Sequence, residues 1–164
     1  MQLVTLTAKL MNVEGIEIVK VAADDKILQR KSLTGRWPVL ETPDGTLISE
    51  SLAIAKYFAR SHPTFYGQTE AQRAQVEMWI DFINSSITPA AKHVADQVLG
   101  YASSDVKSFS IALNELKLNL ASLEKHLRLR NFLVGHQLTL ADALLVSTLS
   151  VCFELVLDKK TRDN

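Results

Sequence analysis

The spacing of apolar residues changes near residue 67, and this change constrains the fold more than any other feature of the sequence. Before it, three short stretches have the alternation or composition of β-strands: Ile16–Val21, Val39–Thr42 and Leu47–Ser49. After it, apolar residues recur every three or four positions, as they do on one face of a helix. The sequence therefore predicts an α+β chain, with a small mixed domain over residues 1–66 and an all-helical domain over residues 67–164.

The segment Thr42–Thr46, with the sequence TPDGT, predicts a tight turn between the last two strands. Proline presets one turn angle, aspartate accepts hydrogen bonds from its own backbone, and glycine tolerates a positive φ. Apolar residues then recur at helical spacing over Ser51–Arg60, which predicts a helix entered directly from the third strand.

Two segments of the helical domain have the sequence patterns that are typical of helix N-termini. Thr69 followed by Gln72 matches a capping box, and the apolar face that follows runs until Pro89, which we expect to bend or end the helix. Thr139 and Asp142 predict a second capped start, with a structural role. Between them lies a seam of residues spaced by four and three: Phe109, Leu113, Leu116, Leu120, Leu123 and Leu127. Such a seam indicates an internal bundle helix or, as the alternative, a helix that forms a dimer.

Charge and cysteine content exclude several classes of protein. Lys plus Arg and Asp plus Glu number 18 each, so we expect neither direct nucleic-acid binding nor attraction to an anionic membrane. The single cysteine, Cys152, indicates a reducing compartment, and we expect the cytoplasm. The longest apolar stretch, Leu138–Leu157, is interrupted by Asp142 and Glu154, which favours a core helix over a membrane span. The four histidines are scattered and no glycine-rich phosphate loop follows a strand, so we expect no metal and no nucleotide.

Three segments occur in the order and approximate spacing found in glutathione-transferase-like proteins: Gly35–Leu40 (GRWPVL), Ile48–Ile54 (ISESLAI) and Leu138–Asp142 (LTLAD). The chain resembles this superfamily, which implies a thioredoxin-like first domain and the family's all-helical second domain. Within the superfamily it is similar to the gamma subunit of eukaryotic elongation factor 1, on the segments SESLAIAKYF, from Ser49, and FLVG, from Phe132.

The resemblance implies a site for glutathione, as a ligand and not as a cofactor. It implies a cis bond before Pro38, with Trp37 near the cleft, whereas the sequence alone favours a trans proline and leaves Trp37 equally open to burial in the core. It implies that Glu50 pairs with the ligand ammonium and that Ser51, with the free amides at the helix start, binds the neighbouring carboxylate. The alternative is that Glu50 and Ser51 only cap the helix.

The sequence departs from catalytic members of the superfamily at its beginning. These members place a Tyr, Ser or Cys after the first strand, where it hydrogen-bonds to the glutathione sulfur and lowers the pKa of its thiol. Before Gly15 only Thr5 and Thr7 carry hydroxyls, and fourteen positions are too few for a strand, a connection and a helix of typical lengths. We therefore expect the first strand to be missing and no catalytic residue, with Thr7 as a weak candidate donor.

The expected function is that of a non-catalytic scaffold in translation elongation, whose implied partners are the nucleotide-exchange subunits of the elongation factor 1 complex. The resemblance also implies self-association as a homodimer. Two alternatives stay open: an active glutathione transferase that conjugates glutathione to electrophiles, and an assembly domain of an aminoacyl-tRNA synthetase complex.

Overall fold

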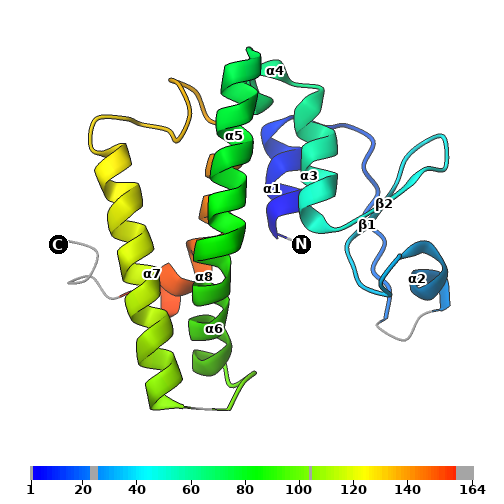
Figure 1. Cartoon of the computed structure of the whole chain (residues 1–164). Helices are drawn as coiled ribbons and strands as arrows, with labels where there is room; N and C mark the ends of the chain where they lie inside the picture. The colour runs from blue at the N-terminus through cyan, green and yellow to red at the C-terminus, as the bar shows by residue number, and fades with distance from the viewer. Residues whose placement is uncertain (1, 23–25, 104, 158–164) are drawn as a thin grey trace. The chain divides into compact units, whose positions relative to one another are not determined.

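The computed structural model describes residues 2–22, 26–103 and 105–157. Contacts between Cα atoms divide the chain into two compact units, Met1–Gln68 and Thr69–Asn164. Among the described residues, both β-strands lie in the first unit, and every regular element of the second is a helix (Figure 1). The α+β class predicted from the apolar spacing is therefore confirmed.

The described residues of the first unit form four helices and one hairpin: α1 (Gln2–Leu10), α2 (Lys26–Lys31), β1 (Val39–Glu41), β2 (Leu47–Ser49), α3 (Ser51–Arg60) and α4 (Pro63–Tyr66). The strands pair antiparallel, with Leu40 opposite Ile48. Helix α1 packs against α3 (Figure 1). Buried apolar side chains from α1, α3 and α4 form the core of this unit: Leu3, Ile54, Ala55, Phe58, Ala59, Phe65 and Tyr66.

The hairpin turn forms at the predicted TPDGT segment. The Thr42 N–H donates to the Thr46 carbonyl at 3.0 Å, and Gly45 adopts a φ of +81° and donates to the Thr42 carbonyl at 2.8 Å. The Asp44 carboxylate accepts the Thr42 hydroxyl and, at 3.1 Å, the Thr46 N–H. These hydrogen bonds, that from Thr42 first, lower the pKa of Asp44 from its ordinary value.

The strand predicted over residues 16–21 is wrong. These residues form no regular element, and Ile16, Ile18 and Val19 are 40%, 58% and 68% exposed. A strand exists only where its backbone groups pair with a neighbouring strand. In the part of the chain that the structure describes, the only sheet contains β1 and β2, so this stretch pairs with nothing despite its alternating composition.

Leu3, Leu6 and Leu10 recur at helical spacing, and all three lie in helix α1. The helix ends at Leu10 because Asn12 adopts a left-handed φ of 48°. The Val13 N–H then donates to the Ala8 carbonyl at 3.0 Å, which satisfies one of the terminal carbonyls.

The second unit contains α5 (Glu70–Phe82), the π-helical segment η1 (Ile83–Ile87), α6 (Thr88–Val98), α7 (Val106–Leu127) and α8 (Leu140–Leu155). Helix α8 packs against α5 and α6, and α6 packs against α7. The predicted inward seam of α7 is confirmed, since Leu116 and Leu123 are buried and Phe109, Leu113, Leu120 and Leu127 are half-buried. None of the described helices combines the length and apolar content that crossing a bilayer requires.

The predicted start of α5 is confirmed, because the Thr69 hydroxyl oxygen accepts the Gln72 N–H at 3.2 Å. Pro89, however, does not end the helical path. The path continues from α5 through η1, and Pro89 occupies the first turn of α6, where its missing N–H does least harm. Asn119 of α7 donates its side-chain amide to the Ser86 carbonyl at 3.1 Å, which helps to satisfy the altered hydrogen bonding of the π turn.

Candidate ligand-binding site on the first unit

The pairing of the two strands brings the predicted ligand-binding residues to one end of the hairpin. Val39, the first residue of β1, lies opposite Ser49, the last residue of β2. Pro38 directly precedes Val39 and Glu50 directly follows Ser49, so the two segments meet although they are twelve positions apart in the sequence. The Trp37–Pro38 peptide bond is cis, as the family resemblance implies and as the sequence alone does not.

The loop before Trp37 is held by Ser32, which is buried. Its hydroxyl donates to the Arg36 carbonyl at 2.7 Å and accepts the Arg36 N–H at 3.0 Å. The Leu33 N–H lies 3.4 Å from Oγ of Ser49, which connects this loop to the end of β2. Trp37 itself is 53% exposed, so its ring is not a core residue and is available for contact. Sequence reasoning missed Ser32, because a lone serine carries no signal of this role.

Glu50 has an unusual backbone conformation, with φ 76° and ψ 127°. Positive φ is costly for a residue with a side chain, on the order of 1–3 kcal/mol, and such positions cluster at ligand-binding sites. Glu50 begins α3 through its carbonyl, which accepts the Ile54 N–H at 3.0 Å, but its side chain makes no capping hydrogen bond. Glu50 therefore caps the helix with its carbonyl and not with its side chain, and its exposed carboxylate faces solvent.

Ser51 is the first residue of α3, where backbone N–H groups have no partner within the helix. A helix start of this kind attracts a carboxylate, while the adjacent Glu50 carboxylate attracts an ammonium group. The end of the hairpin thus suits a ligand that carries both groups on one carbon atom, as the gamma-glutamyl end of glutathione does.

The two hydroxyls at the beginning of the chain lie inside α1. The Thr5 hydroxyl donates to the Gln2 carbonyl at 3.0 Å. Thr7 is completely buried, and its Oγ1 has no hydrogen-bond partner in the described structure. As placed, the Thr7 hydroxyl has no surface from which to donate to a ligand sulfur, which argues against Thr7 as the activating residue.

Thr139 and Asp142 form the predicted capping box at the start of α8, in the second unit. Oδ2 of Asp142 accepts the Thr139 N–H at 2.8 Å and the Thr139 hydroxyl at 2.7 Å. Oδ1 accepts the N–H of Leu133, nine residues away, at 2.9 Å. His126 donates from Nε2 to the Leu133 carbonyl at 2.9 Å, with its ring 4.6 Å from that of Trp79. The sequence predicted the cap and not this link between α5, α7 and α8.

The described residues contain no group of three or more His, Cys, Asp or Glu side chains arranged to hold a metal ion. Cys152 is buried in α8 and donates weakly to the Ala91 carbonyl, with a sulfur–oxygen distance of 3.5 Å. Burial raises the pKa of its thiol, so it is a poor nucleophile in the folded chain.

Two protein-family models match the chain. The model of the glutathione S-transferase N-terminal domain matches residues 2–69, and that of the glutathione S-transferase C-terminal domain matches residues 68–164. Among solved structures, the glutathione S-transferase-like domain of elongation factor 1-gamma from Saccharomyces cerevisiae has a TM-score of 0.85 at 19% identity, covering 99% of this chain and 77% of that one. Glutathione S-transferase-I bound with lactoylglutathione has a TM-score of 0.84 at 24% identity, covering 94% and 78%. The predicted fold class is thus confirmed.

Curated relatives at higher identity are of two kinds. Elongation factor 1-gamma of Rattus norvegicus is 37% identical over 133 residues, or 81% of this chain and 30% of the relative. Probable elongation factor 1-gamma 2 of Arabidopsis thaliana is 37% identical over 128 residues, or 77% and 31%. Glutathione S-transferase-like protein LUC7 of a Fusarium species is 38% identical over 134 residues, or 78% and 60%. The chain thus spans about a third of the length of the elongation-factor relatives.

Proposed function

The chain belongs to the glutathione S-transferase family, and from this premise we propose that it acts as a non-catalytic binding module in eukaryotic translation elongation. Its proposed partners are the nucleotide-exchange subunits of elongation factor 1, and its proposed location is the cytoplasm. The similarity to elongation factor 1-gamma from an animal and a plant, at 37% identity over 77–81% of the chain, carries this proposal.

The placement of the two hydroxyls of α1 argues against Thr5 and Thr7 as residues that activate a thiol. A transferase must lower the pKa of the glutathione thiol, which is about 8.5 without help, so that a useful fraction is ionised near neutral pH. Thr7 is buried and Thr5 bonds to its own helix, so neither presents a free hydroxyl at the site. We propose that the residues around the cis proline and the start of α3 retain glutathione as a ligand without activating it: Trp37, Pro38, Glu50 and Ser51.

Replacing Glu50 by glycine separates ligand binding from folding. Glycine adopts positive φ without steric cost, so Glu50→Gly is expected to raise the free energy of unfolding by about 1 kcal/mol, after its larger unfolded-state entropy is counted. The same change removes the carboxylate that pairs with the ligand ammonium, so glutathione affinity is expected to fall at least about tenfold. Urea unfolding and isothermal titration calorimetry measure the two effects.

Glu50→Gln is the matched control, because it removes the charge and keeps the strained backbone. It is expected to lose affinity for glutathione and to gain no stability. A Glu50→Gly variant that is less stable than the parent would show instead that the Glu50 side chain supports the fold. Failure of the parent to bind millimolar glutathione would reject the ligand site and leave the proposed assembly role standing.

Affinity capture tests the assembly role directly. The tagged chain is incubated with purified nucleotide-exchange subunits of elongation factor 1, and a stoichiometric complex that survives gel filtration is expected. A parallel capture from cell extract distinguishes the alternatives. Recovery of aminoacyl-tRNA synthetases without exchange subunits would reject the elongation-factor assignment in favour of the synthetase complex.

An active glutathione transferase is the second candidate function. The similarity to glutathione S-transferase-like protein LUC7 and the strained, uncapped Glu50 favour it. Steady-state conjugation of glutathione to an aromatic electrophile separates the candidates. A rate equal to the uncatalysed reaction is expected, and turnover clearly above that rate would overturn the non-catalytic proposal.

A further inference from the structure

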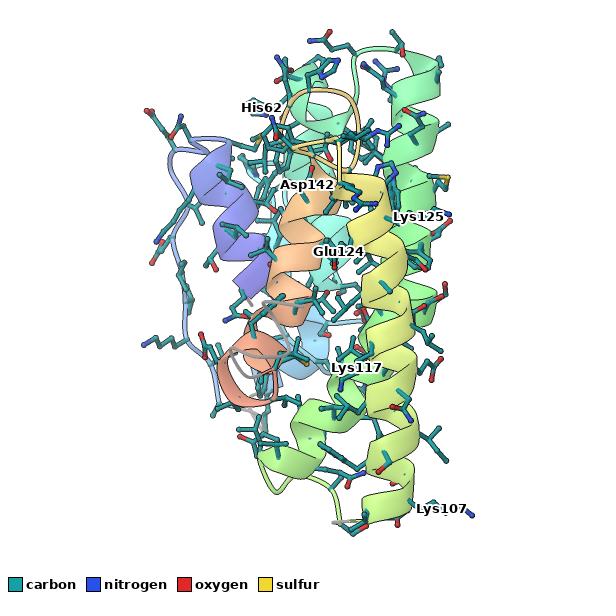
Figure 2. All side chains as sticks on the ribbon, turned by 90° about the vertical axis from the view of Figure 1, so that its left-hand side faces the viewer. His62, Lys107, Lys117, Glu124, Lys125 and Asp142 are labelled. Atoms are coloured by element: carbon teal, nitrogen blue, oxygen red, sulfur yellow. The ribbon has the colours of Figure 1, made fainter. Side chains whose placement is uncertain are left out.

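Four basic side chains lie along one face of α7 and are called the basic row here: Lys107, Lys117, Lys125 and Arg128. With 3.6 residues per turn, their directions around the helix axis fall within an arc of about 80°. Arg128 lies just past the last residue of α7, but its angles of φ −51° and ψ −33° keep it on the helical path. Figure 2 shows Lys107 at the lower end of α7, Lys117 near its middle and Lys125 near its upper end.

The positive charges of the basic row are not neutralised by neighbouring side chains. All four residues are exposed, and none of them forms an ion pair among residues 2–22, 26–103 and 105–157. On the neighbouring helix α6, by contrast, Lys92 pairs with Asp96. The whole chain has 18 basic and 18 acidic residues, so the row is a local excess of positive charge on a chain without net charge.

The residues between and beside the basic row suit contact with a second helix. Ser110, Asn114 and Ala121 occupy the same arc, and all three are exposed. Their short side chains let a second helix axis approach closely, because the distance between packed helices depends on the side chains at the contact. Ile111 and Leu118 border the arc on one side and are 59% and 72% exposed. A helix with an acidic row beside an apolar row is complementary to this surface.

Two exposed acidic residues flank the basic row and argue against a nucleic acid as its partner. Glu124 borders the arc on the side away from Leu118, and Glu115 lies beyond Ile111 on the other side. A nucleic acid presents closely spaced phosphates and binds through many basic contacts, so these two carboxylates would repel it. The arc also contains no aromatic side chain on which a base could stack.

From the exposed charges, the short residues between them and the apolar border, we propose that this face of α7 binds an acidic amphipathic helix of another protein. The basic row pairs with carboxylates of the partner helix, and Ile111 and Leu118 contact its apolar row. From Lys107 to Arg128 the basic row extends about 32 Å at 1.5 Å per residue, so a partner helix of about six turns covers it. The inference goes beyond the proposed function, because it does not depend on which assembly the chain joins.

Fluorescence anisotropy of the full chain with a labelled synthetic peptide tests the proposal. The peptide has about six helical turns, is rich in alanine, and carries a row of glutamates at the spacing of the basic row beside a row of leucines. A dissociation constant on the order of tens of micromolar is expected at low salt. A peptide of the same composition in scrambled order is the control and is expected to bind at least about fivefold more weakly. At about 1 M salt, where charges are screened beyond about 3 Å, binding of the ordered peptide is expected to weaken about tenfold.

Charge reversal at Lys117 tests whether the peptide lies on the basic row. Lys117→Glu replaces an attraction by a repulsion and is expected to weaken binding of the ordered peptide about threefold to tenfold. Lys117→Arg keeps the charge and is expected to bind like the parent chain. Lys9→Glu, the same charge change at an exposed residue of α1, is the matched control and is expected to change the affinity less than about twofold. Lys117 lies near the middle of the row, so a peptide whose central glutamate is replaced by lysine is expected to bind Lys117→Glu more tightly than it binds the parent chain.

Circular dichroism of each variant verifies that the helices remain, so a loss of binding is not a loss of fold. An ordered peptide that does not bind at several hundred micromolar would overturn the proposal. So would equal binding of the ordered and scrambled peptides, or binding that is indifferent to Lys117→Glu. Single-stranded RNA of about the same length is the competing ligand. RNA that binds more tightly than the peptide and displaces it would assign the basic row to nucleic acid and overturn the acidic helix as its partner.

Discussion

Leu116→Ala is expected to lower the free energy of unfolding by about 2–5 kcal/mol. Leu116 has no exposed surface and lies in the middle of the buried seam of α7. Truncation removes three carbon atoms from this core and leaves a cavity that the surrounding helices fill only in part, so the lost transfer energy and the lost packing add.

Urea unfolding followed by circular dichroism measures this effect as a lower midpoint at constant slope. Leu118→Ala is the matched control, because it makes the same chemical change two residues further along the same helix. Its side chain is 72% exposed, so a change within about 0.5 kcal/mol is expected. Equal effects of the two substitutions would contradict the assignment of the inner and outer faces of α7.

Asp142→Ala is expected to cost about 2–3 kcal/mol, more than an ordinary helix cap. Loss of a cap costs about 1 kcal/mol. Here the carboxylate also accepts the N–H of Leu133 at 2.9 Å, and an unsatisfied backbone donor in a partly buried site adds about 1–3 kcal/mol. The change therefore loosens both the start of α8 and the loop before it.

Three variants separate the contribution of the helix cap from that of the hydrogen bond to Leu133. Thr139→Ala keeps the Leu133 contact and removes the Thr139 hydroxyl, which donates to Asp142 at 2.7 Å, so a smaller loss of about 1 kcal/mol is expected. Asp142→Asn keeps one acceptor oxygen and is expected to fall between these two. Asp81→Ala, on the exposed face of α5, is the control and is expected to have little effect on urea unfolding. A loss for Asp142→Ala no larger than that for Thr139→Ala would show that the link to Leu133 contributes nothing.

The elements that sequence analysis predicted correctly depend on interactions between close neighbours. The TPDGT turn, the capping residue Thr69 and the box of Thr139 with Asp142 each involve residues within four positions of one another. The buried seam of α7 was equally visible, because a 4–3 repeat indicates a packed helix face wherever its partner lies. In each case local geometry leaves few other backbone conformations for the segment.

The predictions that failed depended on a partner elsewhere in the chain. Residues 16–21 have the alternation of a strand, and they pair with nothing among the described residues. Of the two effects expected of Pro89, a bend or an end of the helix, the end does not occur, because the helical path continues through a π turn whose Ser86 carbonyl accepts a hydrogen bond from Asn119, thirty-three residues away. Composition sets which secondary structure a segment favours, and packing against a neighbouring element decides whether that structure forms.

The sequence by itself determined the two-part architecture, the hairpin, the helix starts and the α+β class, because hydrophobic period and turn chemistry act over a few residues. Only the tertiary structure decided that Glu50 takes a positive φ and that its side chain makes no capping hydrogen bond. It also decided that the Thr7 side chain of α1 is buried and that Trp37 is exposed beside a cis proline. These features follow from which distant segments pack together. Pairing of Val39 with Ser49 brings Pro38 to Glu50, and packing of α1 against α3 is a contact between distant segments that local spacing does not encode.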